Sequence, residues 1–276
     1  MKNYLLFFIA LSMGAQVLSQ NLGAPKFDYK VFYELKYQPD SLDESSVKNE
    51  TMVLFLGNNY SKFSSIGQHI KDSVFQTYNN KARTMDNYAE YKSKIPVIDH
   101  KYIVIKNSKS DEMYFLEKIG KDNLGYKETI ENFKWQIKDE FKTVSGYRTQ
   151  KAITYFKGRE FVAWFSEEIP IPNGPYKFGG LPGLIIQLND TKEHYVFNLI
   201  SFNKLKPSVK SDVILDNFLL TDKKKFDQLK QDYKQNPLAN FERSGASISF
   251  TPAQREMFIK ENRKQMEKDN NPLELE

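Results

Sequence analysis

The sequence predicts a mainly β fold, an antiparallel meander sheet with helices at its periphery. From Lys26 to Gln38, apolar and polar residues alternate with the period of two that is typical of a half-buried strand. Strand-like segments then follow one another, separated by short breaks of Gly, Asn and Asp. This order favours an antiparallel meander over alternating βαβ units.

The first nineteen residues are predicted to be a signal peptide that is cleaved after about Ser19. Lys2 precedes an apolar run from Tyr4 to Leu11, and small side chains follow it. The run is too short to cross a bilayer core of about 30 Å. No later segment is long and apolar enough, so we expect no transmembrane span in the mature chain. The expected product is one exported domain over residues 20–276, in the periplasm or at the cell surface or secreted.

After the first strand, one internal helix and ten more strands are predicted. Apolar residues at every fourth position predict a helix over residues 66–79, with Ser64 or Ser65 as its cap. The ten strands lie near residues 51–56, 60–64, 101–106, 112–118, 123–129, 134–142, 148–156, 159–166, 183–189 and 194–203.

The part from about residue 220 to 276 is predicted to be helical and charged. Thr221 is the candidate cap of a first helix, which carries Phe226 and Leu229 on a narrow apolar stripe. Thr251 opens a second helix, with Pro252 at its first position. The tail after about Lys264 is polar, and we expect it to fray.

Several strands are apolar on both faces, which bears on function. Phe161 and Phe165 share one face of a predicted strand, and Val162 and Trp164 share the other. An antiparallel sheet with one wet face does not show this pattern. Two explanations stay open: helices and loops complete an ordinary two-layer core, or the sheet curls over an apolar cavity.

Composition excludes several functional classes. The chain has no Cys, only three His, and a net charge of +5 spread among acidic residues, so it lacks thiol chemistry and the basic stripe of a nucleic-acid binder. No signature of a nucleophile elbow, phosphate loop, dinucleotide fold or zinc protease is present. His69, His100 and His194 have no spacing that brings them together. We therefore expect no catalytic residue, metal or cofactor.

One loop region stands out between two predicted strands. Pro170, Pro172 and Pro175 fix the backbone, so residues 170–175 form a stiff connector. Gly179, Gly180 and Gly183 permit positive φ or a close backbone approach, and Pro182 followed by Gly183 fits a type II turn.

Residues 180–185 read Gly-Leu-Pro-Gly-Leu-Ile, and Lys151-Ala152 and Gly158-Arg159 precede them in a matching context. In these residues the chain resembles the GLPGLI family of exported proteins, which is typical of Bacteroidetes-type bacteria and largely uncharacterised. The tight match covers about 45 residues. Many relatives carry a Cys shortly before the Lys-Ala pair, where this chain has Thr149 and Gln150.

The family is similar to the bowl-like N-terminal module of some bacterial enzymes that deglycosylate glycoproteins. The resemblance implies a curved antiparallel sheet that forms a half-open barrel or bowl without a catalytic centre of its own.

Two interpretations of the loop stay open: a turn that plugs the core, or a rim that contacts a ligand or partner. For the second, the candidate binding residues are Trp164, Pro175, Tyr176, Lys177, Phe178 and Leu181, around the motif turn of Gly180, Pro182 and Gly183.

The expected function is that of a non-enzymatic module of the cell envelope. Its expected partner is an apolar or amphipathic ligand such as a lipid, or a glycan, or an outer-membrane protein. The alternative is a hydrolase of envelope glycans or peptides that uses carboxylates distant in the sequence. A purely structural accessory protein is a third hypothesis.

Overall fold

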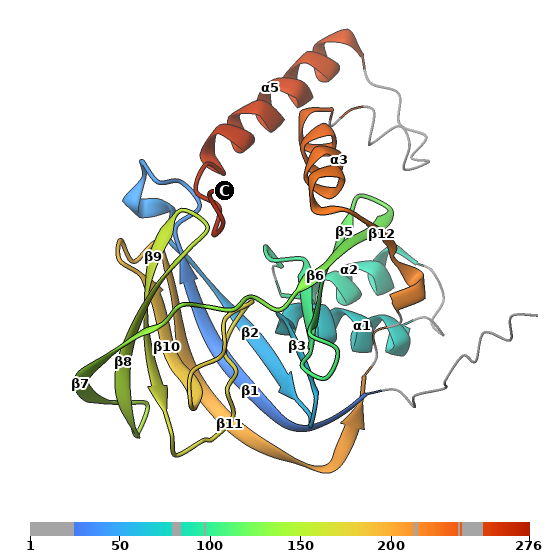
Figure 1. Ribbon diagram of the computed structural model, residues 1–276. Coiled ribbons are helices and arrows are strands. Elements are labelled where there is room, and N and C mark those ends of the chain that lie inside the picture. The colour runs from blue at the N-terminus through green and yellow to red at the C-terminus, as the bar shows by residue number, and fades with distance from the viewer. Residues whose placement is uncertain are drawn as a thin grey trace, which may run out of the picture.

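The computed structural model describes residues 25–78, 84–96, 98–211, 213, 215–236, 238 and 251–276. The predicted signal peptide and its cleavage site lie outside these residues. Figure 1 shows a strongly curved sheet, with helices at its right-hand side and above its open end. The predicted fold class, a bowl-shaped antiparallel meander with peripheral helices, is confirmed.

The described residues form one 12-stranded sheet with the order β12-β6-β5-β4-β3-β2-β1-β11-β10-β9-β8-β7. Neighbours in this order pair antiparallel, except that β12 pairs parallel with β6. The strands are β1 (Lys26–Tyr37), β2 (Lys48–Leu56), β3 (Tyr60–Ser65), β4 (Tyr102–Asn107), β5 (Glu112–Ile119), β6 (Asp122–Thr129), β7 (Gln136–Val144), β8 (Tyr147–Phe156), β9 (Arg159–Ser166), β10 (Leu184–Asp190), β11 (Tyr195–Lys210) and β12 (Leu219–Thr221).

The chain crosses the open side of the sheet between β6 and β7. These strands lie toward opposite ends of the strand order, and residues 130–135 connect them across the front of the bowl (Figure 1). Ile130, Phe133 and Trp135 pack from this connection against the core. The apolar faces of both halves of the sheet therefore meet inside the bowl.

The helices agree with the sequence in part. Helix α1 (Ile66–Tyr78) is as predicted, and Ser65 Oγ accepts from the Gly67 N–H at 3.1 Å. Helix α5 (Pro252–Lys268) begins at the predicted Thr251 cap, within a capping box. Helix α3 (Lys223–Gln235) is capped by Asp222, not by the predicted Thr221.

Three short helical elements were not predicted. They are α2 (Met85–Ser93) and the 3-10 helices η1 (Glu44–Ser46) and η2 (Leu215–Asn217). All three are mainly polar and too short for a clear apolar periodicity.

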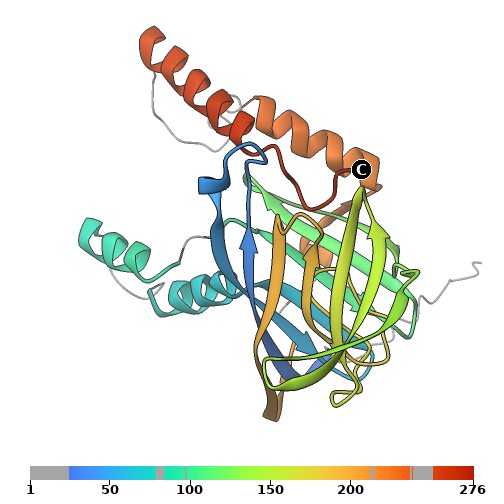
Figure 2. The same ribbon diagram turned by 90° about the vertical axis from the view of Figure 1, so that its left-hand side faces the viewer.

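The expectation of a frayed tail is wrong. Residues 269–276, which we call the strap, leave α5 and cross the open end of the sheet (Figure 2). Asn271 and Leu273 are 4% and 9% exposed. The strap is ordered because the rim of the bowl provides hydrogen-bond partners for its polar groups, which no local pattern reveals.

Strand β7 is an exposed edge of the sheet. It pairs with β8, and the register is irregular between Ile137 and Phe141, both about half exposed. Four of its nine residues are charged: Lys138, Asp139, Glu140 and Lys142.

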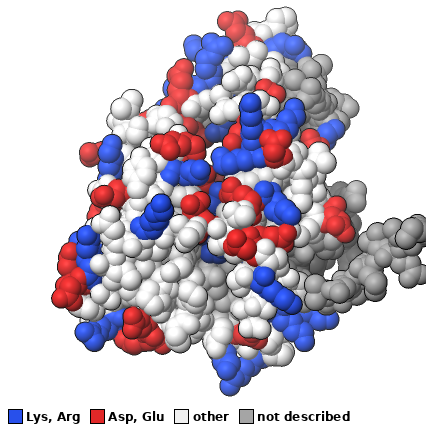
Figure 3. Space-filling model, in the orientation of Figure 1, with Lys and Arg blue, Asp and Glu red and all other residues white. Residues whose placement is uncertain are grey.

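Charges of both signs are intermixed on the face shown in Figure 3 and gather in its upper part, around the open end of the bowl. This face shows no continuous basic stripe. Within the described residues, none of the helices has the length and apolarity needed to span a membrane.

Candidate functional site

The inside of the bowl is filled by the connection between β9 and β10. We call residues 167–183 the plug loop. Its Phe178 is 0% exposed and lies among Phe133, Phe156 and Phe161, with ring centroids 4.9, 5.3 and 4.7 Å away. Of the two interpretations of this loop, the structure supports the plug, and the cavity beneath a curled sheet is occupied by the protein itself.

The other predicted rim residues also face inward. Pro175, Tyr176, Lys177 and Leu181 are buried. The Tyr176 ring lies 5.2 Å from the ring of Tyr102. These side chains are buried against other parts of the chain in this structure and do not form an exposed rim.

Two buried lysines hold the plug loop in place. Lys177 Nζ lies 3.0 Å from Glu128 Oε1 and 2.7 Å from Glu274 Oε1, and it donates to Tyr126 Oη at 3.0 Å. Lys106 Nζ donates to the Phe178 carbonyl oxygen at 2.8 Å. Burial lowers the pKa of Lys106 to about 7. Its partners on the loop are the uncharged carbonyl oxygens of Lys177 and Phe178.

The motif glycines serve the two purposes that the sequence allowed, positive φ and close backbone approach, but the predicted turn is not formed. Gly180 takes the positive φ, +83°, and no atom lies within 4 Å of a Cβ built on it. Gly183 has no positive φ, so the predicted type II turn with Gly183 at its left-handed position is wrong. A Cβ on Gly183 would lie 2.0 Å from the carbonyl oxygen of Ser166, so the glycine permits close packing against the end of β9.

Trp164 is separate from the plug loop residues. The neighbouring Phe161, Ala163 and Phe165 point into the core, so Trp164 lies on the outer face of the sheet, where it is partly buried. Lys142 Nζ sits 4.1 Å from its ring centroid and also donates to Gln187 Oε1 at 2.8 Å.

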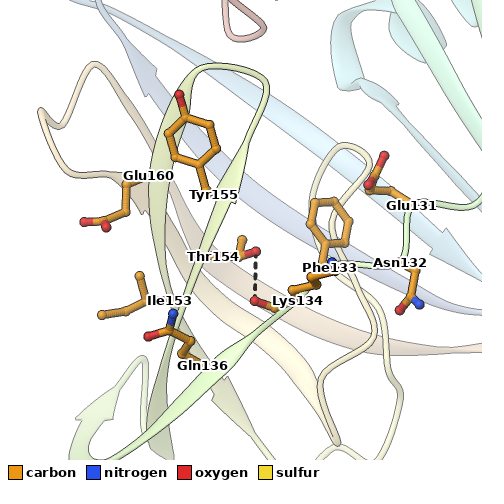
Figure 4. A pocket seen from close by; sticks show the side chains of 9 residues that line it. All are labelled: Glu131, Asn132, Phe133, Lys134, Gln136, Ile153, Thr154, Tyr155 and Glu160. Carbon is orange, nitrogen blue, oxygen red and sulfur yellow. Dashed lines mark hydrogen bonds between the residues drawn. The ribbon is translucent and has the colours of Figure 1, made fainter.

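An open pocket of about 420 Å³ lies between residues 131–134, the start of β7, the end of β8 and the start of β9. In Figure 4, Glu131 and Glu160 stand at opposite sides of it, and Tyr155 stands at one end. The lining residues are Glu131, Asn132, Phe133, Lys134, Gln136, Ile153, Thr154, Tyr155 and Glu160.

The pocket combines an exposed aromatic ring with polar groups of several kinds. Tyr155 is 66% exposed. Thr154 Oγ1 donates to the Lys134 carbonyl oxygen at 3.4 Å, which ties the two walls together. Phe133 belongs both to the pocket wall and to the cluster around Phe178. Sequence reasoning missed this pocket, because its residues come from a connection and three strands without a shared motif.

The histidines stay apart, as the sequence predicted. His100 Nδ1 lies 2.7 Å from Glu50 Oε2, and His69 Nε2 lies 3.2 Å from Ser64 Oγ. His194 Nδ1 is near the Arg159 guanidinium. Among the described residues, no group of three His, Asp or Glu side chains is arranged to hold a metal ion.

A family model described as a protein of unknown function (Porph_ging) matches residues 127–187. This stretch includes the plug loop and every residue that lines the pocket. No curated protein matches the chain.

Two crystal structures of PNGF-II are similar in fold, each with a TM-score of 0.50 and 12% sequence identity. The similarity covers 75% of this chain but only 34% and 33% of those chains, so this chain spans about a third of their length.

Proposed function

We propose that the chain is an exported, non-catalytic accessory module that binds glycans at the pocket beside β7. The observation that carries this proposal is the contrast between a filled bowl and an open pocket on its outside. An apolar ligand has no space where Phe178 packs, whereas a polar ligand can reach Tyr155 from solvent.

The pocket offers the groups that a sugar ring needs. A tyrosine ring presents an apolar face to the C–H groups of a pyranose while its hydroxyl stays wet. The Asn132 and Gln136 amides both donate and accept, and the Glu131 and Glu160 carboxylates accept from sugar hydroxyls. A small number of polar groups around an aromatic surface fixes the orientation of a ligand.

One comparison bears on the pocket and the other on the accessory role. The matched family stretch contains the whole lining of the pocket. The fold resembles about a third of PNGF-II, an N-glycanase, which fits a module that accompanies glycan chemistry instead of performing it. Export rests on the predicted signal peptide, and the GLPGLI assignment rests on the motif.

Glycan titration followed by tryptophan fluorescence tests the proposal. The Trp135 ring lies 5.7 Å from Phe133 in the pocket wall, so it reports on occupancy. We expect chitooligosaccharides or oligomannosides to shift its emission, and Tyr155→Ala and Glu160→Gln to weaken the response. Ile200→Ala, an exposed residue of β11, is the matched control and leaves the affinity unchanged. No shift with either glycan class contradicts the proposal.

A second candidate, a glycan hydrolase, is favoured by one observation: two carboxylates, Glu131 and Glu160, line the same pocket. Acid and base carboxylates on either side of a sugar are the usual arrangement for glycoside hydrolysis. Turnover of aryl glycosides by the chain, abolished in Glu131→Gln and Glu160→Gln, would replace the binding proposal with this one. Binding without turnover retains the first.

A further inference from the structure

We infer that the mouth of the bowl is a peptide-binding site, which the strap fills in this structure. The ligand it fits is an extended acidic peptide that carries an Asn and, three residues later, a Glu, the spacing of Asn271 and Glu274. A peptide of this chemistry from a partner protein takes the place of the strap.

The rim binds the backbone of the strap. Arg159 donates from Nη2 to the Pro272 carbonyl oxygen at 2.7 Å and from Nε to the Leu273 carbonyl oxygen at 3.1 Å. Tyr195 Oη donates to the Asn271 carbonyl oxygen at 2.8 Å. Main-chain hydrogen bonds of this kind provide affinity for an extended peptide.

Two N–H groups of the strap also form main-chain hydrogen bonds to the rim. The Asn271 N–H donates to the Pro39 carbonyl oxygen at 3.1 Å, and the Leu275 N–H donates to the Lys157 carbonyl oxygen at 2.9 Å.

The side chains of Asn271 and Glu274 are recognised at the mouth of the bowl, and the exposed Asn270 also bonds to Ser41 and Asp40. Asn271 donates from Nδ2 to the Gln38 carbonyl oxygen at 2.7 Å, and its Oδ1 accepts from Arg159 at 2.5 Å, so both ends of its amide are bonded. Glu274 accepts from Tyr176 Oη at 2.5 Å and pairs with Lys177 at 2.7 Å.

The receptor groups keep partners when the strap leaves. Arg159 also pairs with Asp190 at 2.9 Å, and both side chains are buried. Lys177 also pairs with Glu128 and bonds to Tyr126. When the strap leaves, therefore, no buried charge loses all its partners. An unpaired buried charge is the energetic cost that usually makes such a contact permanent. A site that is already organised also binds with less loss of entropy.

Little besides its own contacts holds the strap in place. Helix α5, which leads to it, has no buried residue among those described. Between the end of α5 and α3, the ion pair of Lys234 with Asp269 is solvent-exposed, and such pairs contribute about 0 to 1 kcal/mol. Occupancy of the mouth by the strap thus depends on the high local concentration that a tether provides, and a free peptide competes with it.

The test uses a fluorescent synthetic peptide with the sequence of residues 269–276. We expect it to bind a chain shortened at Lys268 at least about tenfold more tightly than the full chain, in which the tethered strap competes. Peptides with Asn271→Asp or Glu274→Gln should lose about tenfold in affinity, and a scrambled peptide of the same composition should not bind. Tyr155→Ala in the receptor separates this site from the glycan pocket, because it leaves peptide binding unchanged.

Amide hydrogen exchange of the full chain is the second experiment, and it tests the inference even if the shortened chain does not fold. Excess peptide should speed exchange of the Asn271 and Leu275 amides, while the Glu274→Gln peptide should not. Unchanged exchange with peptide in millimolar excess, or no binding by a shortened chain that circular dichroism shows to be folded, overturns the inference.

Discussion

The plug loop enters the bowl with apolar side chains, whereas the strap covers its mouth mainly with backbone groups and polar side chains and adds only Leu273 to the apolar core. Phe178 is surrounded by aromatic rings, and Leu181 and Ile185 pack with it in the same core. Asn271 and Glu274 in the strap make directional bonds to Arg159 and Lys177. Apolar burial stabilises without a specific partner, but each polar contact depends on one group. The loop is therefore part of the fold, and the strap is a bound segment.

The largest expected effect breaks the plug. Phe178→Ala removes a fully buried ring and should lower the free energy of unfolding by about 3 to 5 kcal/mol, through lost transfer energy and the cavity left behind. Denaturant unfolding followed by circular dichroism measures it. A loss below about 1 kcal/mol would mean that the loop contributes little to the core.

The next effect concerns the strap. Glu274→Gln removes the charge that pairs with Lys177 and should cost about 1.5 to 3 kcal/mol at pH 7, the usual value of hydrogen bonds to charged groups.

This cost should depend on pH. Burial raises the pKa of Glu274, but Lys177 and the Tyr176 hydroxyl outweigh burial and hold it below its usual value of 4.5. The charged pair thus contributes its stability above about pH 4.5, and the contribution is lost as pH falls through the lower pKa of the folded state. Thermal midpoints of the two proteins should differ at pH 7 and converge in acid. A constant difference would assign the effect to packing.

A smaller effect tests how the loop is anchored. Gly183→Val places side-chain carbons against the Ser166 carbonyl and should cost about 1 to 3 kcal/mol. Gly180→Ala is the informative companion, because its cost comes from positive φ in open space. Equal stability of Gly183→Val and the parent protein would contradict the close approach at this position.

The smallest effect lies outside the bowl. Tyr155→Ala removes an exposed ring and should change the free energy of unfolding by no more than about 0.5 kcal/mol. The same variant should reduce glycan binding. A large loss of stability would show that the pocket is part of the structural core.

The sequence predicted the sheet well because burial on one face leaves a period of two. Each long strand from β1 to β11 overlaps a predicted segment, although β11 runs on to Lys210 past its predicted end at residue 203. The unexpected β12 has only three residues. The same two-faced runs in β9 indicated that a second layer covers the sheet.

The site was harder to predict, because burial of a polar residue depends on distant partners. Lys177 and Arg159 look like surface residues in the sequence, yet both are buried by segments 49 to 114 residues away. The strap has no apolar periodicity, so only the rim that receives it explains its order. The pocket needs residues from a connection and three strands, which share no motif.

The exposed edge strand β7 has a consequence for self-association. An edge strand presents unpaired backbone groups that another molecule can extend into a continuous sheet. The irregular register of β7 and its charged residues oppose this, because a docking strand would meet a bent backbone and desolvate Lys138 and Glu140. The row of unpaired backbone groups on β7 is thereby kept from seeding fibrils at high protein concentration.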